Sequence, residues 1–184
     1  MLEQRSLNLL VQYRDKSYVM NVLANKSFER FNFIKSICNM PLIIISSVVA
    51  ILNSSSINAE EMKLPNIIIN SITAMLLAMI ANFKVNEKEQ FFKQLANKFM
   101  KLTHNIEDDL NNHLQELTGD DVSSKIKEYD SLIETIEYTF PSKIKKIVYS
   151  KYKNKKTLPS ILNCEGSDFT ISPPITPSAN IIIP

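Results

Sequence analysis

Glycine is scarce in this chain and tryptophan is absent: only Gly119 and Gly166 occur among the 184 residues. Phosphate-binding loops such as the P-loop and the dinucleotide fingerprint need several glycines within a few residues, so these classes of nucleotide site are excluded. The two cysteines, Cys38 and Cys164, are too few for a cysteine-based metal site. We expect both to remain reduced and unpaired.

Residue sets that carry catalysis are missing too. The two histidines, His104 and His113, are nine residues apart, so on one helix they point to opposite sides and cannot share a metal. His104 and Asp108 have helical spacing, which is typical of a solvated surface pair. The acidic run at 107–109 has no second acidic cluster to work with, and no serine sits in a nucleophile elbow. We therefore expect no enzyme activity, no metal and no cofactor.

Two long uncharged runs dominate the centre of the chain, at residues 37–52 and 64–83. At about 1.5 Å of helical rise per residue, the second run covers the ~30 Å hydrocarbon core of a bilayer. Phe33 and Ile34 lengthen the first run, and Lys35 can reach the lipid headgroups. A short polar connection at 53–63 leaves no room for a folded domain. The sequence predicts a transmembrane hairpin at 36–83, with spans at about 36–53 and 64–83.

Lysine and arginine flank the runs unevenly. The connection at 53–63 has only Lys63, beside Glu60 and Glu61. Basic residues are frequent on the other side of both runs: Lys26, Arg30 and Lys35 before the first, and Lys84, Lys88, Lys93, Lys98 and Lys101 after the second. Because cytoplasmic flanks are enriched in such residues, we expect both termini in the cytoplasm and the short connection on the opposite side.

The flanking segments show helical patterns. Residues 1–35 have apolar positions at intervals of three and four, which predicts an amphipathic helix that either continues into the first span through a kink at Pro41 or ends before it. Residues 84–153 form a cytoplasmic helical region. It starts with a near-heptad seam, a candidate oligomerisation surface: Phe92, Leu95, Phe99, Leu102, Ile106 and Leu110. Gly119 is expected to end this helix as its C′ residue.

The C-terminal part is expected to contain a helix with Ile126, Tyr129, Ile133, Ile136 and Phe140 on one face, followed by a short basic helix at 142–153. Seven lysines lie between 143 and 156. They indicate either binding to anionic lipid or an ordinary solvated face, and both interpretations stay open. The proline-rich residues 154–184 lack a helical period and are expected to be a disordered tail.

Small and polar residues recur within both spans, and they have two interpretations. They can let the two helices approach each other and hydrogen-bond, or they can line a water-filled pore in an oligomer. A two-helix protomer cannot enclose a pore alone, so the second interpretation requires self-association. The candidate pore-lining or hairpin-packing residues are Asn39, Ser46, Ala50, Asn70, Thr73, Ala74 and Ala78.

The layout resembles the SLATT family of two-transmembrane proteins. The resemblance covers about residues 21–117 and rests on SFERFNFIKSICNMPLIIISS at the start of the first span and on QFFKQLANKFMKLTHNIEDDL after the second. It implies an oligomeric, pore-forming or membrane-perturbing effector associated with nucleotide second-messenger systems, and relatives extend to large DNA viruses. We find no nucleotide-sensing domain in this sequence, so a trigger would come from a separate partner or from the cytoplasmic helices themselves. The family has no established catalytic residues to transfer.

We therefore expect an all-α membrane protein: a transmembrane hairpin with long amphipathic cytoplasmic helices that form a stalk or coiled-coil-like bundle. Its expected partners are the lipid bilayer, further copies of itself and a separate sensor or scaffold protein, with no nucleic acid. The alternative function is a non-catalytic anchor or scaffold that recruits partners through the seam and the tail. A third possibility is a soluble bundle in which both apolar helices are buried.

Overall fold

The computed structural model describes residues 4–54, 59–112, 117–155 and 157–162, and these residues form helices and connections without a strand. The all-α class predicted from the sequence is confirmed for this part of the chain. In order, the elements are α1 (Gln4–Ser54), α2 (Ala59–Asn82), α3 (Val85–Asn112), α4 (Gly119–Glu134), α5 (Ser142–Tyr152) and a 3₁₀ turn, η1 (Ser160–Leu162).

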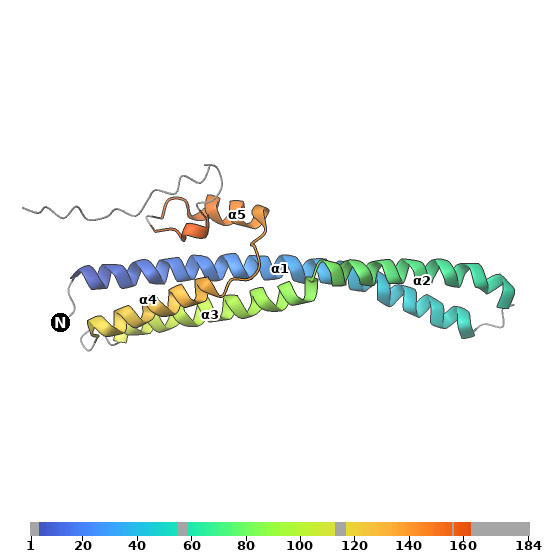
Figure 1. Ribbon diagram of the computed structural model, residues 1–184, viewed down its shortest axis with the longest axis horizontal. Helices are drawn as coiled ribbons and strands as arrows, with labels where there is room; N and C mark the ends of the chain where they lie inside the picture. Colours follow the sequence, from blue (N-terminus) through green and yellow to red (C-terminus); the bar gives the residue numbers. More distant parts are fainter. Residues whose placement is uncertain (1–3, 55–58, 113–116, 156, 163–184) are drawn as a thin grey trace, which may run out of the picture.

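Helix α1 is continuous over 51 residues, with Pro41 inside it. At about 1.5 Å per residue it is about 76 Å long, and it runs along almost the whole molecule (Figure 1). Proline has no N–H group, so Pro41 cannot donate to the carbonyl of Ile37, yet the helix continues past it. Of the two arrangements expected at Pro41, the structure has the continuous helix.

The N-terminal part of α1, α3, α4, α5 and η1 form a compact region that we call the bundle (Figure 1). Helix α3 lies along α1, α4 packs on both, and α5 packs on α1. The core between α1 and α3 holds the seam residues Phe92, Leu95, Phe99, Leu102 and Ile106 fully or almost fully buried, and Leu110 partly buried. The seam therefore packs against α1 of its own chain.

A set of short polar side chains fixes how α1 and α3 are aligned. The hydroxyl of Ser17 donates to the carbonyl of Phe99 at 3.0 Å, and the hydroxyl of Thr103 lies 3.1 Å from that of Ser17. Asn21 Nδ2 donates to the carbonyl of Ala96 at 2.7 Å. In the described residues no buried side-chain polar atom lacks a partner. Sliding one helix past the other would break these bonds, so they favour one register.

The expectation for Gly119 is wrong. Helix α3 ends at Asn112, and Gly119 is the first residue of α4, where Thr118 is the N-cap. Thr118 and Asp121 form a capping box: Thr118 Oγ1 accepts from the N–H of Asp121 at 3.3 Å, and Asp121 Oδ2 accepts from the N–H of Thr118 at 2.9 Å. The Thr118 hydroxyl also donates to Asp121 Oδ2 at 2.6 Å, and this bond, together with the one from the Thr118 N–H, lowers the pKa of the Asp121 carboxyl. Threonine followed three residues later by an acidic residue marks a helix start, and that signal outweighs the glycine.

The C-terminal elements differ from the expected pattern in two places. Helix α4 ends at Glu134, so Ile136 and Phe140 lie in the connection to α5, where Phe140 is buried with its ring 5.1 Å from that of Phe92. Pro159 and Leu162 are also buried, although a disordered tail is expected from residue 154. The turn η1 contacts α5, and Leu162 belongs to the same hydrophobic core as Val148 and Tyr152 of α5. The rest of the predicted tail, 163–184, lies outside the described residues.

Helix α2 and residues 36–54 of α1 extend from the bundle as a pair of neighbouring helices, which we call the apolar arm (Figure 1). Helix α2 already begins at Ala59, so residues 59–63, expected in the connection, are helical. The residues between the two helices, 55–58, lie outside the described part of the chain. The arm is therefore an α-helical structure almost to its tip.

Candidate functional site: an exposed apolar arm

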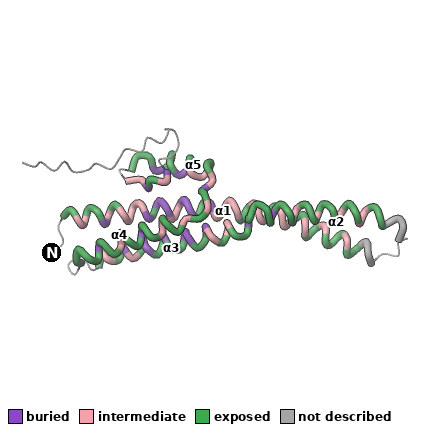
Figure 2. Tube along the Cα trace, viewed as in Figure 1, coloured by how far each residue is buried: buried purple, intermediate pink, exposed green. Residues whose placement is uncertain are grey.

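The side chains of the apolar arm are exposed although they are strongly apolar. In the most apolar 18-residue window of α1 the buried share is 0%, and in that of the segment Lys63–Asn112 it is 6%. Figure 2 shows the arm mostly exposed, with buried residues gathered in the bundle. Six of the most exposed side chains are Met40, Ile43, Ile51, Leu64, Met75 and Ile44.

By length and composition, both helices of the arm are able to cross a membrane. The third possibility, a soluble bundle that buries both apolar helices, does not describe this chain, because its core lies elsewhere. A soluble monomer rarely exposes a continuous apolar surface of this extent, so the arm is the strongest candidate for a functional surface.

The two helices of the arm face each other along one line of partly buried residues. Apart from the neighbours Cys38 and Asn39, these residues recur at intervals of three and four, as expected for one face of an α-helix, and Ile80 alone among them is buried. They are Cys38, Asn39, Leu42, Ile45 and Val49 on α1, and Asn66, Ile69, Thr73, Leu76 and Ile80 on α2.

The predicted span residues divide into two groups in this geometry. Asn39 and Thr73 are partly buried on the facing sides, so they take part in packing of the arm. The others are exposed and lie away from the line of contact: Ser46, Ala50, Asn70, Ala74 and Ala78. Within a single chain, packing between α1 and α2 therefore accounts for only part of the small and polar pattern.

Hydroxyl and amide side chains in the arm differ in whether they have a hydrogen-bond partner. Ser46 donates to the carbonyl of Leu42 at 2.8 Å, and Ser71 donates to that of Ile67 at 2.8 Å. Such i−4 bonds satisfy a hydroxyl without a second helix. By contrast, the side chains of Asn39 and Asn70 form no hydrogen bond with the described part of the chain. An amide without a partner is costly in an apolar surrounding, so these groups need water or another protein.

The border between arm and bundle is held by an ion pair and a backbone turn. Lys35 Nζ of α1 lies 2.7 Å from Glu89 Oε2 of α3. Between α2 and α3, Lys84 has a φ of 50°, in the left-handed region that costs energy for a residue with a side chain. Lys84 Nζ lies 3.4 Å from Glu87 Oε2, so this turn has its own charge partner.

Tyr138, from the connection between α4 and α5, reaches the same border. Its hydroxyl donates to Glu87 Oε2 at 2.9 Å. This bond raises the pKa of Tyr138 and, together with Lys84, lowers the pKa of Glu87. The ammonium of Lys88 lies 5.9 Å from the centre of the Tyr138 ring and 5.8 Å from that of Phe31. Lysine and aromatic side chains therefore lie together at the point where the arm leaves the bundle.

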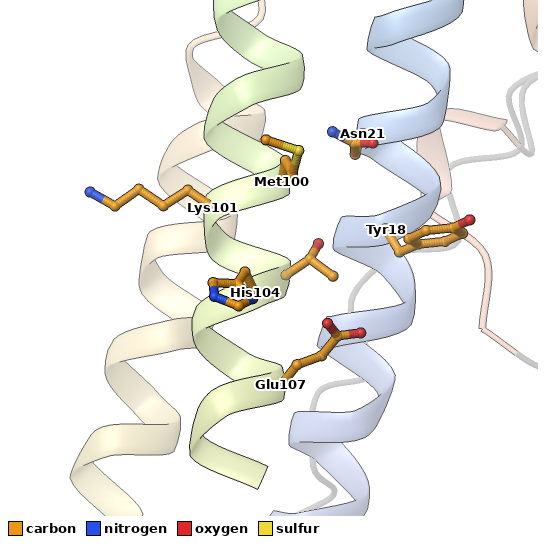
Figure 3. Close-up of a pocket in the computed structure, with 7 residues that line it drawn as sticks. Tyr18, Asn21, Met100, Lys101, His104 and Glu107 are labelled. Atoms are coloured by element: carbon orange, nitrogen blue, oxygen red, sulfur yellow. The ribbon is translucent and has the colours of Figure 1, made fainter. Parts of the chain in front are cut away.

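A groove of about 600 Å³ lies between α1 and α3 within the bundle. Figure 3 shows Met100 and Glu107 on α3 reaching toward the α1 side, while Lys101 points away from it. The lining residues are Tyr18, Asn21, Met100, Lys101, Thr103, His104 and Glu107. Asn21 and Thr103 also belong to the polar set that aligns the two helices.

The groove does not assemble a recognisable catalytic set. Asp108, which is one turn from His104, accepts a hydrogen bond from Asn112 Nδ2 at 2.6 Å. Within the described ranges, no group of three or more histidine, cysteine or acidic side chains is placed to hold a metal ion. His113 lies outside those ranges.

Sequence reasoning missed the polar contacts between α1 and α3 and the pair Lys35–Glu89. Ser17, Asn21 and Thr103 lie on otherwise apolar helix faces. Polar residues in such positions indicate hydrogen bonds between helices, but the spacing of apolar residues alone does not reveal them. The pair Lys35–Glu89 joins residues 54 positions apart, so no local pattern points to it.

No protein-family model, curated protein or solved structure matches this chain. The resemblance to the SLATT family therefore stays a prediction. Any functional assignment depends on the exposed arm, its unpaired amides and the border to the bundle.

Proposed function

We propose that this chain is an integral membrane protein whose apolar arm crosses the bilayer as a hairpin and whose bundle lies in the cytoplasm. The observation that carries the proposal is the nearly complete exposure of two helices long and apolar enough to span. Transfer of one exposed leucine or isoleucine side chain out of water is worth about 1.5–3 kcal/mol, and the arm has many. A bilayer also suits helices, because their backbone groups are satisfied internally.

The border supports this placement. Lys35, Lys84 and Lys88 surround the base of the arm, while Phe33 and Phe83 are exposed beside them. Lysine and aromatic side chains are favoured where hydrocarbon meets headgroups, and the basic side of a hairpin usually remains in the cytoplasm. Both termini would then be cytoplasmic, with the short connection across the membrane.

Self-association of the arm follows from where its polar residues lie. Successive helix residues turn by about 100°, which puts Ser46 and Asn70 within about a quarter turn of the contact line of their helices. Because α1 and α2 run in opposite directions, the two residues lie on the same side of the arm. We infer that this side meets further copies, forming an oligomeric pore or membrane-perturbing assembly of the kind that the SLATT resemblance implies.

A non-catalytic anchor or scaffold is the second candidate. The seam expected to recruit partners is buried against α1, so it is not open to them in this arrangement. What favours the scaffold is the groove of about 600 Å³ between α1 and α3, which remains accessible. Under this function the arm would anchor the chain without altering permeability.

The deciding experiment reconstitutes full-length protein into liposomes and follows dye release as a function of protein density. Carbonate extraction verifies insertion in the same vesicles. Steeply rising release with fully inserted protein supports the oligomeric pore. Fully inserted protein in tight vesicles favours the scaffold, and protein that carbonate removes contradicts membrane insertion altogether.

Orientation is measured with single cysteines in a background carrying Cys38→Ser and Cys164→Ser. Lys63→Cys reports on the far end of the arm, and Lys127→Cys reports on the bundle. An impermeant maleimide added to sealed cells should label Lys63→Cys and leave Lys127→Cys unlabelled until the membrane is opened. The reverse labelling pattern would contradict the cytoplasmic placement of the bundle.

A further inference from the structure

Helices α4 and α5 carry opposite charge. Helix α4 exposes five acidic side chains, Asp120, Asp121, Glu128, Asp130 and Glu134. Of its two lysines, Lys125 is largely buried in a 3.0 Å ion pair with Asp109, which leaves Lys127 exposed. Residues 142–155 contain no acidic side chain and six lysines, Lys143, Lys145, Lys146, Lys151, Lys153 and Lys155.

The two helices lie on opposite sides of α1 (Figure 1). On one side the ring of Tyr129 in α4 is 5.2 Å from that of Tyr13, and on the other the ring of Tyr152 in α5 is 6.2 Å from that of Tyr18. In the part of the chain that the structure describes, α4 and α5 make no contact with each other. Their charges therefore cannot compensate each other within one copy.

Several of these charges have no ion-pair partner in the described residues. This holds for Lys143, Lys151 and Lys153 on the basic side, and for Glu128 and Glu134 on the acidic side. Between the lysines, Ile147 is 54% exposed and Tyr149 is 44% exposed. A charged rim around exposed apolar and aromatic side chains is the composition of a protein-binding surface.

The distance from the base of the arm argues against the lipid bilayer as the partner of this surface. Tyr152 packs beside Tyr18, which precedes Lys35 by 17 residues on the same helix, or about 25 Å. Charges in solution are screened over about 8–10 Å at ordinary salt concentrations. Lys151 and Lys153 are thus too far below the headgroups for strong attraction to them.

We propose that the basic segment 142–155, which comprises α5 and the residues after it, docks on the acidic surface of α4 of a second copy of this chain. Tyr13 contacts α4 and Tyr18 contacts α5, so these two residues show where along α1 each charged surface lies. They are separated by little more than one helical turn along α1. Copies whose arms share one bilayer therefore present Lys151 and Lys153 at a similar height to Glu128 and Glu134.

The contact is head-to-tail, because it joins two different faces. Such contacts repeat from copy to copy and close into a ring when the rotation allows it. The inference rests on the proposed function, since it takes both copies to be inserted in the same orientation. It adds to that function a cytoplasmic surface that brings the arms together.

The test uses two charge-reversal variants of the full-length protein. The first carries Lys151→Glu and Lys153→Glu, and the second carries Glu128→Lys and Glu134→Lys. Each alone places like charges at both faces, whereas in a mixture every contact between the two different variants joins opposite charges. Energy transfer between copies labelled at Lys63→Cys, in the background without Cys38 and Cys164, measures association in liposomes.

We expect each variant alone to need about tenfold higher density in the membrane for half-maximal transfer, and the equimolar mixture to return to the unaltered value. Raising the salt from about 50 to about 500 mM should weaken association of the unaltered protein. The control carries Lys93→Glu and Lys98→Glu, two exposed positions on α3, which changes net charge by as much as the first variant and should have no effect. Unchanged association of either variant, or a mixture that is not restored, would overturn the proposal.

Dye release is recorded on the same vesicles, so the two proposals are tested separately. Restored energy transfer in the mixture without any dye release would support the α4–α5 contact and count against the pore. Clear dye release at the same level in all variants, with energy transfer that is also unchanged, would support the pore and overturn this contact.

Discussion

Lys35 and Glu89 join α1 to α3 at the level where the apolar arm leaves the bundle. Their charged atoms are 2.7 Å apart, and the side chains are 34% and 12% exposed. Glu89 is thus largely withdrawn from water, and Lys35 supplies the compensating charge. The pair ties the start of the first apolar run to the helix that follows the second.

Replacing Lys35 with methionine should lower the free energy of unfolding of the bundle by about 1 kcal/mol, because Glu89 loses its partner while remaining partly buried. Thermal unfolding in detergent, followed by circular dichroism, measures the change. Lys26→Met is the matched control, since Lys26 pairs with Glu29 on an exposed surface. Equal losses in the two variants would mean that the border pair has no special role.

Truncation of Phe99 to alanine should lower the free energy of unfolding by about 3–5 kcal/mol, because its side chain is fully buried against Tyr129 and α1. The neighbouring Met100 is 58% exposed, so Met100→Ala should change stability by less than about 0.5 kcal/mol. Limited proteolysis of inserted protein distinguishes the two. A Phe99→Ala protein that resists protease as well as the unaltered chain would show that the seam is not the core.

Asn70→Leu should reduce dye release and energy transfer between copies while leaving carbonate-resistant insertion intact. The exposed amide has no hydrogen bond within the described chain, so its partner is expected in another copy or in pore water. Ile68→Leu, at an exposed apolar position of the same helix, is the control. Release that persists at the unaltered level in Asn70→Leu and Ser46→Leu would remove the polar side of the arm from the mechanism.

Alkaline pH should destabilise the bundle through Tyr129. Burial raises the pKa of its phenol well above the ordinary value of 10.0. The unfolded chain therefore loses this proton first, and stability falls as pH rises above about 10, whereas it is fully present below that value. Urea unfolding between pH 8 and pH 11 should show a shallower decline for Tyr129→Phe than for the unaltered protein. Parallel declines would exclude Tyr129 as the source.

Periodicity was sufficient to predict the two apolar helices and the buried face of α3, because both depend on residues close together in the sequence. It could not identify the partner of that face, since α1 of the same chain and α1 of another copy offer the same apolar pattern. The sequence also could not show that Ser46 and Asn70 are exposed, because small and polar residues suit both contact within one arm and contact between arms. Only the rotation of each helix in the structure separates these cases.

At the start of α4, two local signals competed. Gly119 is typical of a helix end, whereas Thr118 with Asp121 is typical of a helix start, and the capping hydrogen bonds decided the outcome. The burial of Phe140 beyond the end of α4 is a different case. A residue in a connection has no period to follow, so its position is determined by packing against Phe92.

The two connections between arm and bundle differ mechanically. On one side α1 passes through without a break, so the first apolar run and the part of α1 that precedes it form one continuous helix. On the other side, Phe83 and Lys84 interrupt the helical path between α2 and α3. A tilt of the bundle therefore tilts the first apolar helix with it. Helix α2, by contrast, can change its angle to the bundle through rotation of the backbone at Phe83 and Lys84.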